Sequence, residues 1–215
     1  MKFEKSDEPS VVYGRGINDK KYKTHFDRED GKSKPIREYR MWTSMLSRCY
    51  SEKYRLPTYT QCFVGDSFIK YSDFCDWLYK QHGYIWLKEN NIDFETCDWA
   101  IDKDILVRGN KEYSASTCCF VPRQINSLFI LRGGDRGELP LGVSYHKPHR
   151  KYVAQLGLGK GKPITIGAYK TVEEAFLAYK KAKEGYIKEQ ANKWKDCLDD
   201  VVYNSLMNFI IEENM

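Results

Sequence analysis

The sequence predicts an α+β protein in which helices and strands occupy separate segments. Three observations support this class. First, an apolar stripe at helical spacing begins near Ile36. Second, residues 99–122 have the pattern of a strand, a polar loop and a second strand. Third, residues 141–186 show three short strands followed by one amphipathic helix. We therefore expect an N-terminal helical region, a ββα unit, and a C-terminal three-stranded antiparallel sheet with one helix.

The composition of the chain bounds its class before any motif is considered. With 215 residues, 41% of them hydrophobic, the chain can form one large or two small domains. No run approaches the roughly 18 apolar residues of a membrane span, and the N-terminus lacks the apolar segment of a signal peptide. The seven cysteines are an odd number in a sequence without an export signal, which indicates reduced thiols. No C-x-x-C pair exists and the four histidines are scattered, which argues against a structural zinc site. We expect a cytoplasmic protein that makes no contact with membranes.

The first third of the chain predicts a short arm and then two helices. Residues 1–35 are polar and contain several glycines, so we expect an irregular arm with one short strand. One apolar helical stripe follows, formed by Tyr39, Trp42, Met45, Leu46 and Cys49. A second helix is expected over residues 71–81, capped by Ser72 and stopped by Gly83.

The middle of the chain predicts the ββα unit. Residues 99–101 and 118–121 have the pattern of two strands, and Pro122 stands at the favoured first-turn position of a helix. This unit would close a helical and ββα region that spans residues 36–131. Residues 132–140 are rich in glycine and charge, and they predict a linker.

The C-terminal part predicts a small domain over residues 141–194 and then a further helix over residues 195–215. Its strands are expected at residues 143–145, 152–156 and 164–169, and Thr171 begins a capping box with Glu174. The apolar side chains of the last helix leave two outcomes open. This helix packs back on the core, or it pairs with a second copy in a homodimer.

The charge of the chain is concentrated in this small domain. From Gly137 to Lys195 there are 12 Lys or Arg and 5 Asp or Glu, a net charge of +7, whereas the whole chain carries +5 and the remainder therefore −2. Such a cluster attracts phosphates in a salt-sensitive manner, although a solvated lysine-rich helix face would show the same count. Strand alternation predicts the side chains that face away from the helix: Ser144, Gln155 and Thr165 on the strands, with Lys147, His149, Arg150 and Lys151 in the first turn.

A resemblance to a known family rests on four short motifs of this domain. They are Gly142-Val143, Lys151-Tyr152-Val153-Ala154-Gln155-Leu156, Ile166-Gly167-Ala168-Tyr169-Lys170-Thr171, and Glu173-Glu174-Ala175 with Ala178-Tyr179. Over some 50 residues this pattern resembles the apetala/ethylene-response-factor type of DNA-binding domain. The resemblance implies a sheet that lies in the major groove of double-stranded DNA. The outer face here has fewer Arg and Trp residues than the plant members, so phosphate contacts would dominate over base readout.

The middle segment resembles an HNH nuclease motif. The matching residues are Ile101-Asp102-Lys103-Asp104, Gly109-Asn110-Lys111, Phe120-Val121-Pro122 and Ile125-Asn126. The resemblance implies that Asp102 and Asn126 hold Mg²⁺ or another divalent cation, that Lys103 or Asp104 assists water or binds phosphate, and that Asn110 orients the loop. The usual base of that family is a histidine, and here Lys103 stands in its place. The segment is therefore a variant nuclease, a silent relic used for DNA binding, or an unrelated charged strand end.

Together these segments resemble phage-encoded proteins of the HNH homing endonuclease-like kind. The run from Tyr39 to Tyr50 and the run DKDILVRGNKEYSASTCCFVP add to this resemblance. It implies a hydrolase that cuts or nicks DNA in the bacterial host cytoplasm. The alternative is a non-enzymatic DNA-binding regulator, or a phage inhibitor whose partner is a host defence protein. The absence of the histidine favours this alternative.

Overall fold

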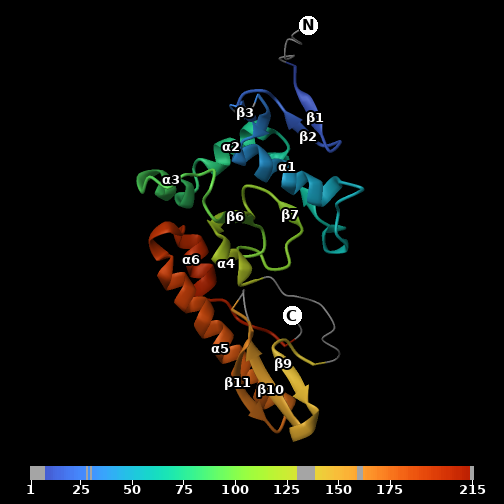
Figure 1. Cartoon of the computed structure of the whole chain (residues 1–215), viewed down its shortest axis with the longest axis vertical. Helices are drawn as coiled ribbons and strands as arrows, with labels where there is room; N and C mark the ends of the chain where they lie inside the picture. The colour runs from blue at the N-terminus through green and yellow to red at the C-terminus, as the bar shows by residue number, and fades with distance from the viewer. Residues whose placement is uncertain (1–7, 28, 30, 130–138, 159–161, 214–215) are drawn as a thin grey trace. The chain divides into compact units, whose positions relative to one another are not determined.

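The computed structural model forms two compact units, residues 1–122 and residues 123–215 (Figure 1). It describes residues 8–27, 29, 31–129, 139–158 and 162–213. The fold is α+β, as predicted, with helices and small sheets in both units. Most of the predicted linker, residues 132–140, lies outside the described residues. No helix in the described part of the chain is long and apolar enough to cross a membrane.

Unit 1 begins with two β-hairpins. Their strands are β1 (Ser10–Val12), β2 (Gly16–Asn18), β3 (His25–Asp27) and β4 (Ser33–Pro35), paired antiparallel in order. The expectation of an irregular arm with one short strand was therefore wrong. Three-residue strands are too short to show a periodic pattern, and tertiary packing fixes the first hairpin. A side chain on Gly16 would come within 2.3 Å of Leu46, so this glycine lets the strand approach the core.

The core of unit 1 is built on α1 (Arg37–Tyr50), which carries the predicted apolar stripe. Trp42, Met45, Leu46 and Cys49 are all buried. The Trp42 indole N–H donates to the carbonyl oxygen of Phe68 at 2.8 Å, so even the polar atom of this buried ring is bonded. The helical period of 3.6 residues thus located the core correctly.

Two expected helix boundaries were wrong. Helix α2 (Tyr71–Leu78) has Lys70 as its N-cap, and Ser72 is a buried residue of the first turn rather than the cap. Gly83 does not stop a helix but lies inside α3 (His82–Glu89). A Cβ at this position would lie 2.2 Å from the Trp99 ring, so the glycine is required for close packing against that ring.

The remaining elements of unit 1 surround a polar loop. They are the short helices η1 (Pro57–Tyr59) and η2 (Asp66–Phe68) and the strands β5 (Phe63–Val64), β6 (Trp99–Asp102), β7 (Glu112–Tyr113) and β8 (Cys119–Pro122). β5 and β7 are parallel, whereas β6 and β8 pair antiparallel from Trp99↔Pro122 to Asp102↔Cys119. The two strands predicted in this segment are thereby confirmed. All seven cysteines of the chain are free thiols, and only Cys97 is not fully buried.

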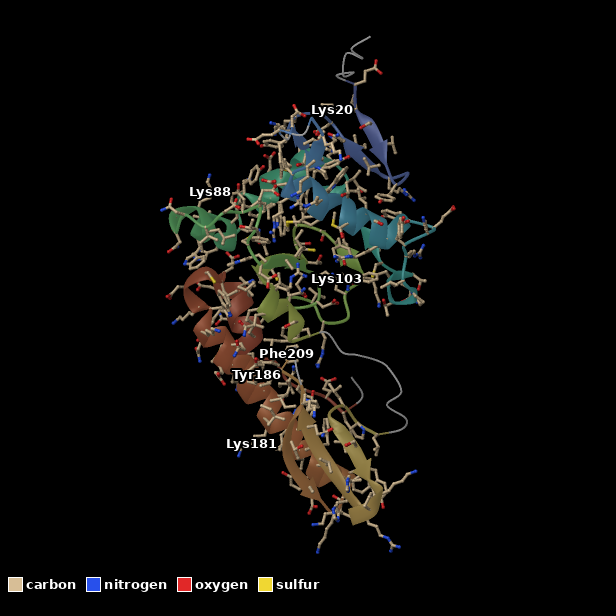
Figure 2. The ribbon with its side chains drawn as sticks, viewed as in Figure 1. Lys20, Lys88, Lys103, Lys181, Tyr186 and Phe209 are labelled. Carbon is tan, nitrogen blue, oxygen red and sulfur yellow. The ribbon has the colours of Figure 1, made fainter. Side chains whose placement is uncertain are left out.

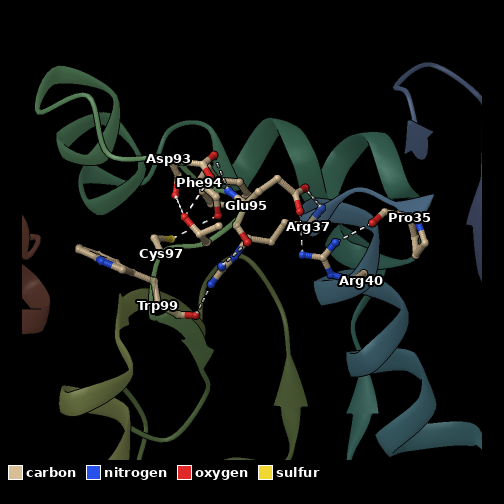
Figure 3. A network of polar contacts seen from close by, with 9 residues as sticks. Pro35, Arg37, Arg40, Asp93, Phe94, Glu95, Cys97 and Trp99 are labelled. Atoms are coloured by element: carbon tan, nitrogen blue, oxygen red, sulfur yellow. Dashed lines mark hydrogen bonds and ion pairs between the residues drawn. The ribbon is translucent and has the colours of Figure 1, made fainter. Parts of the chain in front are cut away.

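A charged network joins the start of α1 to the segment that leads into β6 (Figure 3). The N-cap residue of α1 is Ile36, whose side chain cannot accept a hydrogen bond, and the Glu95 carboxylate accepts from the Arg37 backbone N–H at 2.6 Å instead. The Arg37 guanidinium donates to the carbonyl oxygens of Glu95 and Trp99, and Arg40 forms an ion pair with Glu95 at 2.9 Å. A carboxylate beside the first turn also suits the helix dipole.

Unit 2 contains the predicted sheet and its helix. Its elements are α4 (Arg123–Ser127), β9 (Val143–His146), η3 (Lys147–His149), β10 (Lys151–Leu156), β11 (Ile164–Tyr169), α5 (Val172–Lys193), η4 (Lys195–Cys197) and α6 (Asp200–Met207). The sheet is antiparallel in the order β11-β10-β9, and α5 packs on it (Figure 1). The three strands and the capping box of Thr171 and Glu174 are confirmed.

The last segment of the chain packs back on α5. Helix α6 contacts α5, and Ile211 beyond it is buried. The Ile211 backbone N–H donates to the Glu184 carboxylate at 2.9 Å, and its carbonyl oxygen accepts from Lys180. Of the two outcomes that the sequence left open for residues 195–215, the structure thus shows packing within the same chain.

The Glu95 network predicts a loss of stability in one variant. Glu95→Ala removes the partner of the Arg37 backbone N–H and of Arg40, and it should lower the free energy of unfolding of unit 1 by about 1–3 kcal/mol. The measurement is urea denaturation followed by tryptophan fluorescence. Glu89→Ala, at an exposed position of α3, is the matched control. Equal stability of Glu95→Ala and the wild type would contradict the assigned role.

Candidate functional site

The loop after β6 brings most of the predicted nuclease residues together. Asp102 is the last residue of β6, and one of its carboxylate oxygens accepts from the backbone N–H groups of Asp104 and Ile105 at 2.7 and 2.8 Å. The side chain of Asp102 is buried, and this burial raises its pKa to about 6 even though the two backbone donors oppose the shift. The carboxyl group therefore shapes the turn that follows the strand.

Lys103 points into the same loop and is also buried (Figure 2). Its ammonium group donates to both carboxylate oxygens of Asp104 at 2.8 Å and to the carbonyl oxygen of Asn110 at 2.5 Å. The third partner of its charge is the Tyr113 ring, with 5.9 Å from the ammonium nitrogen to the ring centre. The three hydrogen bonds of the Lys103 ammonium group are thus all made to other residues of this loop.

Asn110 closes the loop from the other side. Its side-chain amide donates to the carbonyl oxygens of Lys103 and Glu112, and its side-chain oxygen accepts from the Glu112 backbone N–H at 3.0 Å. The predicted role of Asn110 in orienting the loop agrees with these contacts. Asp102, Lys103, Asp104 and Asn110 form one cluster, which we name the β6–β7 loop cluster.

The β6–β7 loop cluster is poorly suited to hold a divalent cation in this arrangement. Both oxygens of Asp104 bond to an ammonium group, and the Asp102 oxygen that bonds the turn is committed to two backbone donors. The described residues hold no group of three His, Cys, Asp or Glu side chains arranged for a metal ion. Asn126, the second predicted ligand, lies on α4 in the other compact unit.

The sheet of unit 2 places the predicted DNA-facing residues on one face. Register pairs Ser144 with Val153, and Val153 with Ala168, so these side chains share a face. Gln155 stands two residues after Val153 and pairs with Thr165, which puts Ser144, Gln155 and Thr165 on this same face. We name it the outer face, because Ala154 on the opposite side is fully buried beneath α5.

A basic turn lies at one end of the outer face. Residues 144–151 are all exposed, and this stretch contains Lys147, His149, Arg150 and Lys151. Arg150 adopts a left-handed conformation, with φ at 49°, which ends η3 and starts β10. The sequence contains no Asp or Glu between Glu138 and Glu173. Within the described residues, the cations of the turn therefore have no acidic neighbour on these strands.

Sequence reasoning missed three features of this sheet. His146 and His149 stack their rings with centres 4.9 Å apart across the turn, and Tyr145 packs against Tyr152 at 5.1 Å. β11 also carries one extra residue, Ile166, where the register with β10 shifts. The tyrosine pair follows from cross-strand register and could have been found from it, whereas the bulge leaves no sign in the sequence.

Comparisons with protein-family models, with curated proteins and with solved structures found no match for this chain.

The raised pKa of Asp102 predicts a pH-dependent difference in stability. A buried carboxyl group with a folded-state pKa near 6 contributes stability that is complete below its unfolded value of about 3.9 and is lost as the pH rises through 6. The wild type should therefore lose about 2–3 kcal/mol relative to Asp102→Asn between pH 4 and pH 7. Urea denaturation of both proteins over this range measures the difference. A difference that stays constant with pH would show that the carboxyl group titrates normally.

Proposed function

We propose that this protein binds duplex DNA through the outer face of β9–β11 and the basic turn, and that binding rather than cleavage is its activity. The observation that carries the proposal is a set of cations, on strands that carry no Asp or Glu between residues 138 and 173, beside an open sheet face. Because α5 covers the opposite side of the sheet, the outer face is free to meet a ligand. A three-stranded sheet with one backing helix also accords with the resemblance of this module to a DNA-binding domain.

The side chains of the outer face indicate how such binding would work. Ser144, Val153, Ala168 and Thr165 are small, so the sheet backbone can approach a polyanion closely. The cations of the turn would neutralise phosphates and release counterions, which makes the affinity depend strongly on salt. We infer phosphate-dominated binding with modest base readout.

The lysines of α5 are a weaker candidate for the same role. Lys180 forms an ion pair with Glu184 at 3.1 Å, and this helix also carries Glu173, Glu174 and Glu189. Lys181 lies on the side of α5 away from the strands (Figure 2). Mixed charge of this kind is typical of a solvated helix face, whereas the basic turn has cations only.

Two substitutions in the basic turn test the proposal. Arg150→Ala and Lys151→Ala should each weaken duplex DNA binding by about 3- to 10-fold at moderate salt, similarly for all sequences, and each should reduce the slope of log affinity against log salt by about 1. Fluorescence anisotropy over a salt series measures both quantities. Lys181→Ala is the control that removes one positive charge from the helix. If only Lys181→Ala lost affinity for duplex DNA, the interface would lie on α5 and not on the basic turn.

A metal-dependent phosphodiesterase of HNH type is the second candidate. It is favoured by the order of elements, in which Asp102 ends the first of two antiparallel strands and a helix follows the second strand. The contacts of the β6–β7 loop cluster argue against it, because Lys103 is held by Asp104 and Asn110. Under this candidate, Asp102 and Asn126 would be the residues that contact Mg²⁺.

A plasmid-nicking assay separates the two candidates. With Mg²⁺ or Mn²⁺, we expect the wild type to shift supercoiled plasmid on a gel without nicking it, since the ammonium group of Lys103 stands where a base is required. Asp102→Asn and Lys103→His are tested in parallel. Nicking by the wild type that Asp102→Asn abolishes, with DNA binding retained, would establish the nuclease instead.

A further inference from the structure

Unit 1 has an open groove along the polar side of α1. Its volume is about 450 Å³, and neither the β6–β7 loop cluster nor the sheet of unit 2 contributes to its lining. The apolar stripe of α1 faces the core, so the groove lies along a second stripe of the same helix. It is therefore a site separate from both of those described above.

The floor of the groove consists of side chains at helical spacing. They are Arg40, Thr43, Ser44, Ser47 and Arg48. These positions follow the pattern i, i+3, i+4, i+7 and i+8, which places two cations and three hydroxyl groups in one row. Guanidinium and hydroxyl groups are the donors that bind phosphate oxygens.

Two tyrosines line the groove beside this row. Tyr13 comes from the turn between β1 and β2, and Tyr54 comes from the segment after α1. Tyr54 is 61% exposed and Tyr13 is 42% exposed, so neither ring is part of the core. Large aromatic rings left in water beside cations are typical of surfaces that stack bases.

The backbone of Tyr13 is unusual for its residue type. The turn is closed by a hydrogen bond from the Arg15 N–H to the Val12 carbonyl oxygen at 3.2 Å, and Tyr13 and Gly14 both have positive φ, at 49° and 70°. The first central position of such a turn favours Asn, Asp or Gly, and a tyrosine there costs about 1 kcal/mol. The geometry of the turn therefore gives no reason for a tyrosine at this position.

The charge of the groove is positive. None of its lining side chains is acidic. Arg40 is partly neutralised by its ion pair with Glu95, whereas Arg48 is held by aromatic groups, with its guanidinium carbon 5.9 Å from the centre of the Tyr59 ring. Lys53 lies over the Tyr54 ring at 5.1 Å and adds to the positive charge at this side. Arg48 also hydrogen-bonds to Tyr113, and among the described residues that line the groove none offers it a carboxylate.

We propose that this groove binds an unpaired stretch of nucleic acid. Its phosphates would contact Arg48, Ser44 and Ser47, and a base would stack on Tyr54 or Tyr13. A duplex does not explain the tyrosines, because its bases offer no free ring face, whereas an unpaired strand offers one at every nucleotide. The proposal does not depend on the duplex-binding role of the sheet, since the groove belongs to unit 1.

The test uses the full chain and a short fluorescein-labelled oligothymidylate, followed by fluorescence anisotropy. Tyr54→Ala should weaken binding about 5- to 50-fold, and Tyr54→Phe should retain it because the ring remains. Arg48→Gln should weaken binding about 3- to 10-fold and flatten its salt dependence. All three variants should bind duplex DNA as the wild type does. Lys88→Gln on α3 is the control for loss of one positive charge from unit 1.

Three results would overturn the proposal. The first is equal affinity of Tyr54→Ala and the wild type for the oligothymidylate; this variant is informative because an exposed ring can be removed without disturbing the core. The second is loss of binding only in Arg150→Ala or Lys151→Ala, which would assign the strand to the sheet of unit 2. The third is displacement of the oligothymidylate by polyglutamate as effectively as by unlabelled oligothymidylate, which would show an unselective anion surface.

Discussion

The buried guanidinium of Arg37 is the contact on which unit 1 depends. Charged groups are expensive to bury unless they are paired and hydrogen-bonded. Two nitrogens of the Arg37 guanidinium donate to carbonyl oxygens and its carbon lies 5.2 Å from the ring centre of Phe94, whereas its Nε–H has no partner among the described residues. Since one of those carbonyls belongs to Trp99, the contact fixes the entry of β6 against the start of α1. Glu95 completes the junction by bonding the first turn of the helix. The β6–β7 loop cluster follows directly from this strand, and the groove lies along this helix.

In the β6–β7 loop cluster, the charged side chains are engaged in hydrogen bonds within the loop itself. Asp102, Lys103, Asp104 and Asn110 have the residue types of a catalytic site, yet they bond to one another and to the backbone over a span of nine residues. A loop without regular structure leaves backbone donors and acceptors that require partners, and these side chains supply them. The residue types of the cluster are therefore compatible with catalysis, but their hydrogen bonds determine whether the side chains are available for it.

The sequence predicted those parts of the fold that repeat or are local. The stripe of α1, the three strands of unit 2 and the capping box of Thr171 each rest on a period or on a spacing of three residues. The same alternation placed Ser144, Gln155 and Thr165 on one face. Strands of three residues and the roles of Ser72 and Gly83 were not predictable, because contacts with distant residues such as Trp99 determine them.

The candidate sites divide in the same way. The proximity of Asp102, Lys103 and Asn110 follows from one short loop, but the sequence does not show that Lys103 bonds to Asp104 and Asn110. The floor of the groove, from Arg40 to Arg48, could have been found as the second stripe of α1. Its two tyrosines could not, since Tyr13 and Tyr54 come from turns on either side of the helix in sequence and only the fold brings them to it.

The length of α5 gives the end of the chain a particular role. Its 22 residues extend about 33 Å, whereas a strand of six residues extends about 20 Å, so the sheet cannot cover the whole helix. The rest of its apolar side, which includes Ile187 and Ala191, is buried as well, and α6 and Ile211 pack on this helix. The C-terminal segment of the chain thereby buries the apolar side of α5, which a second subunit would otherwise have to bury. A chain that ended before Leu198 would expose this apolar strip of α5 to water. Exposed apolar surface of this kind favours self-association.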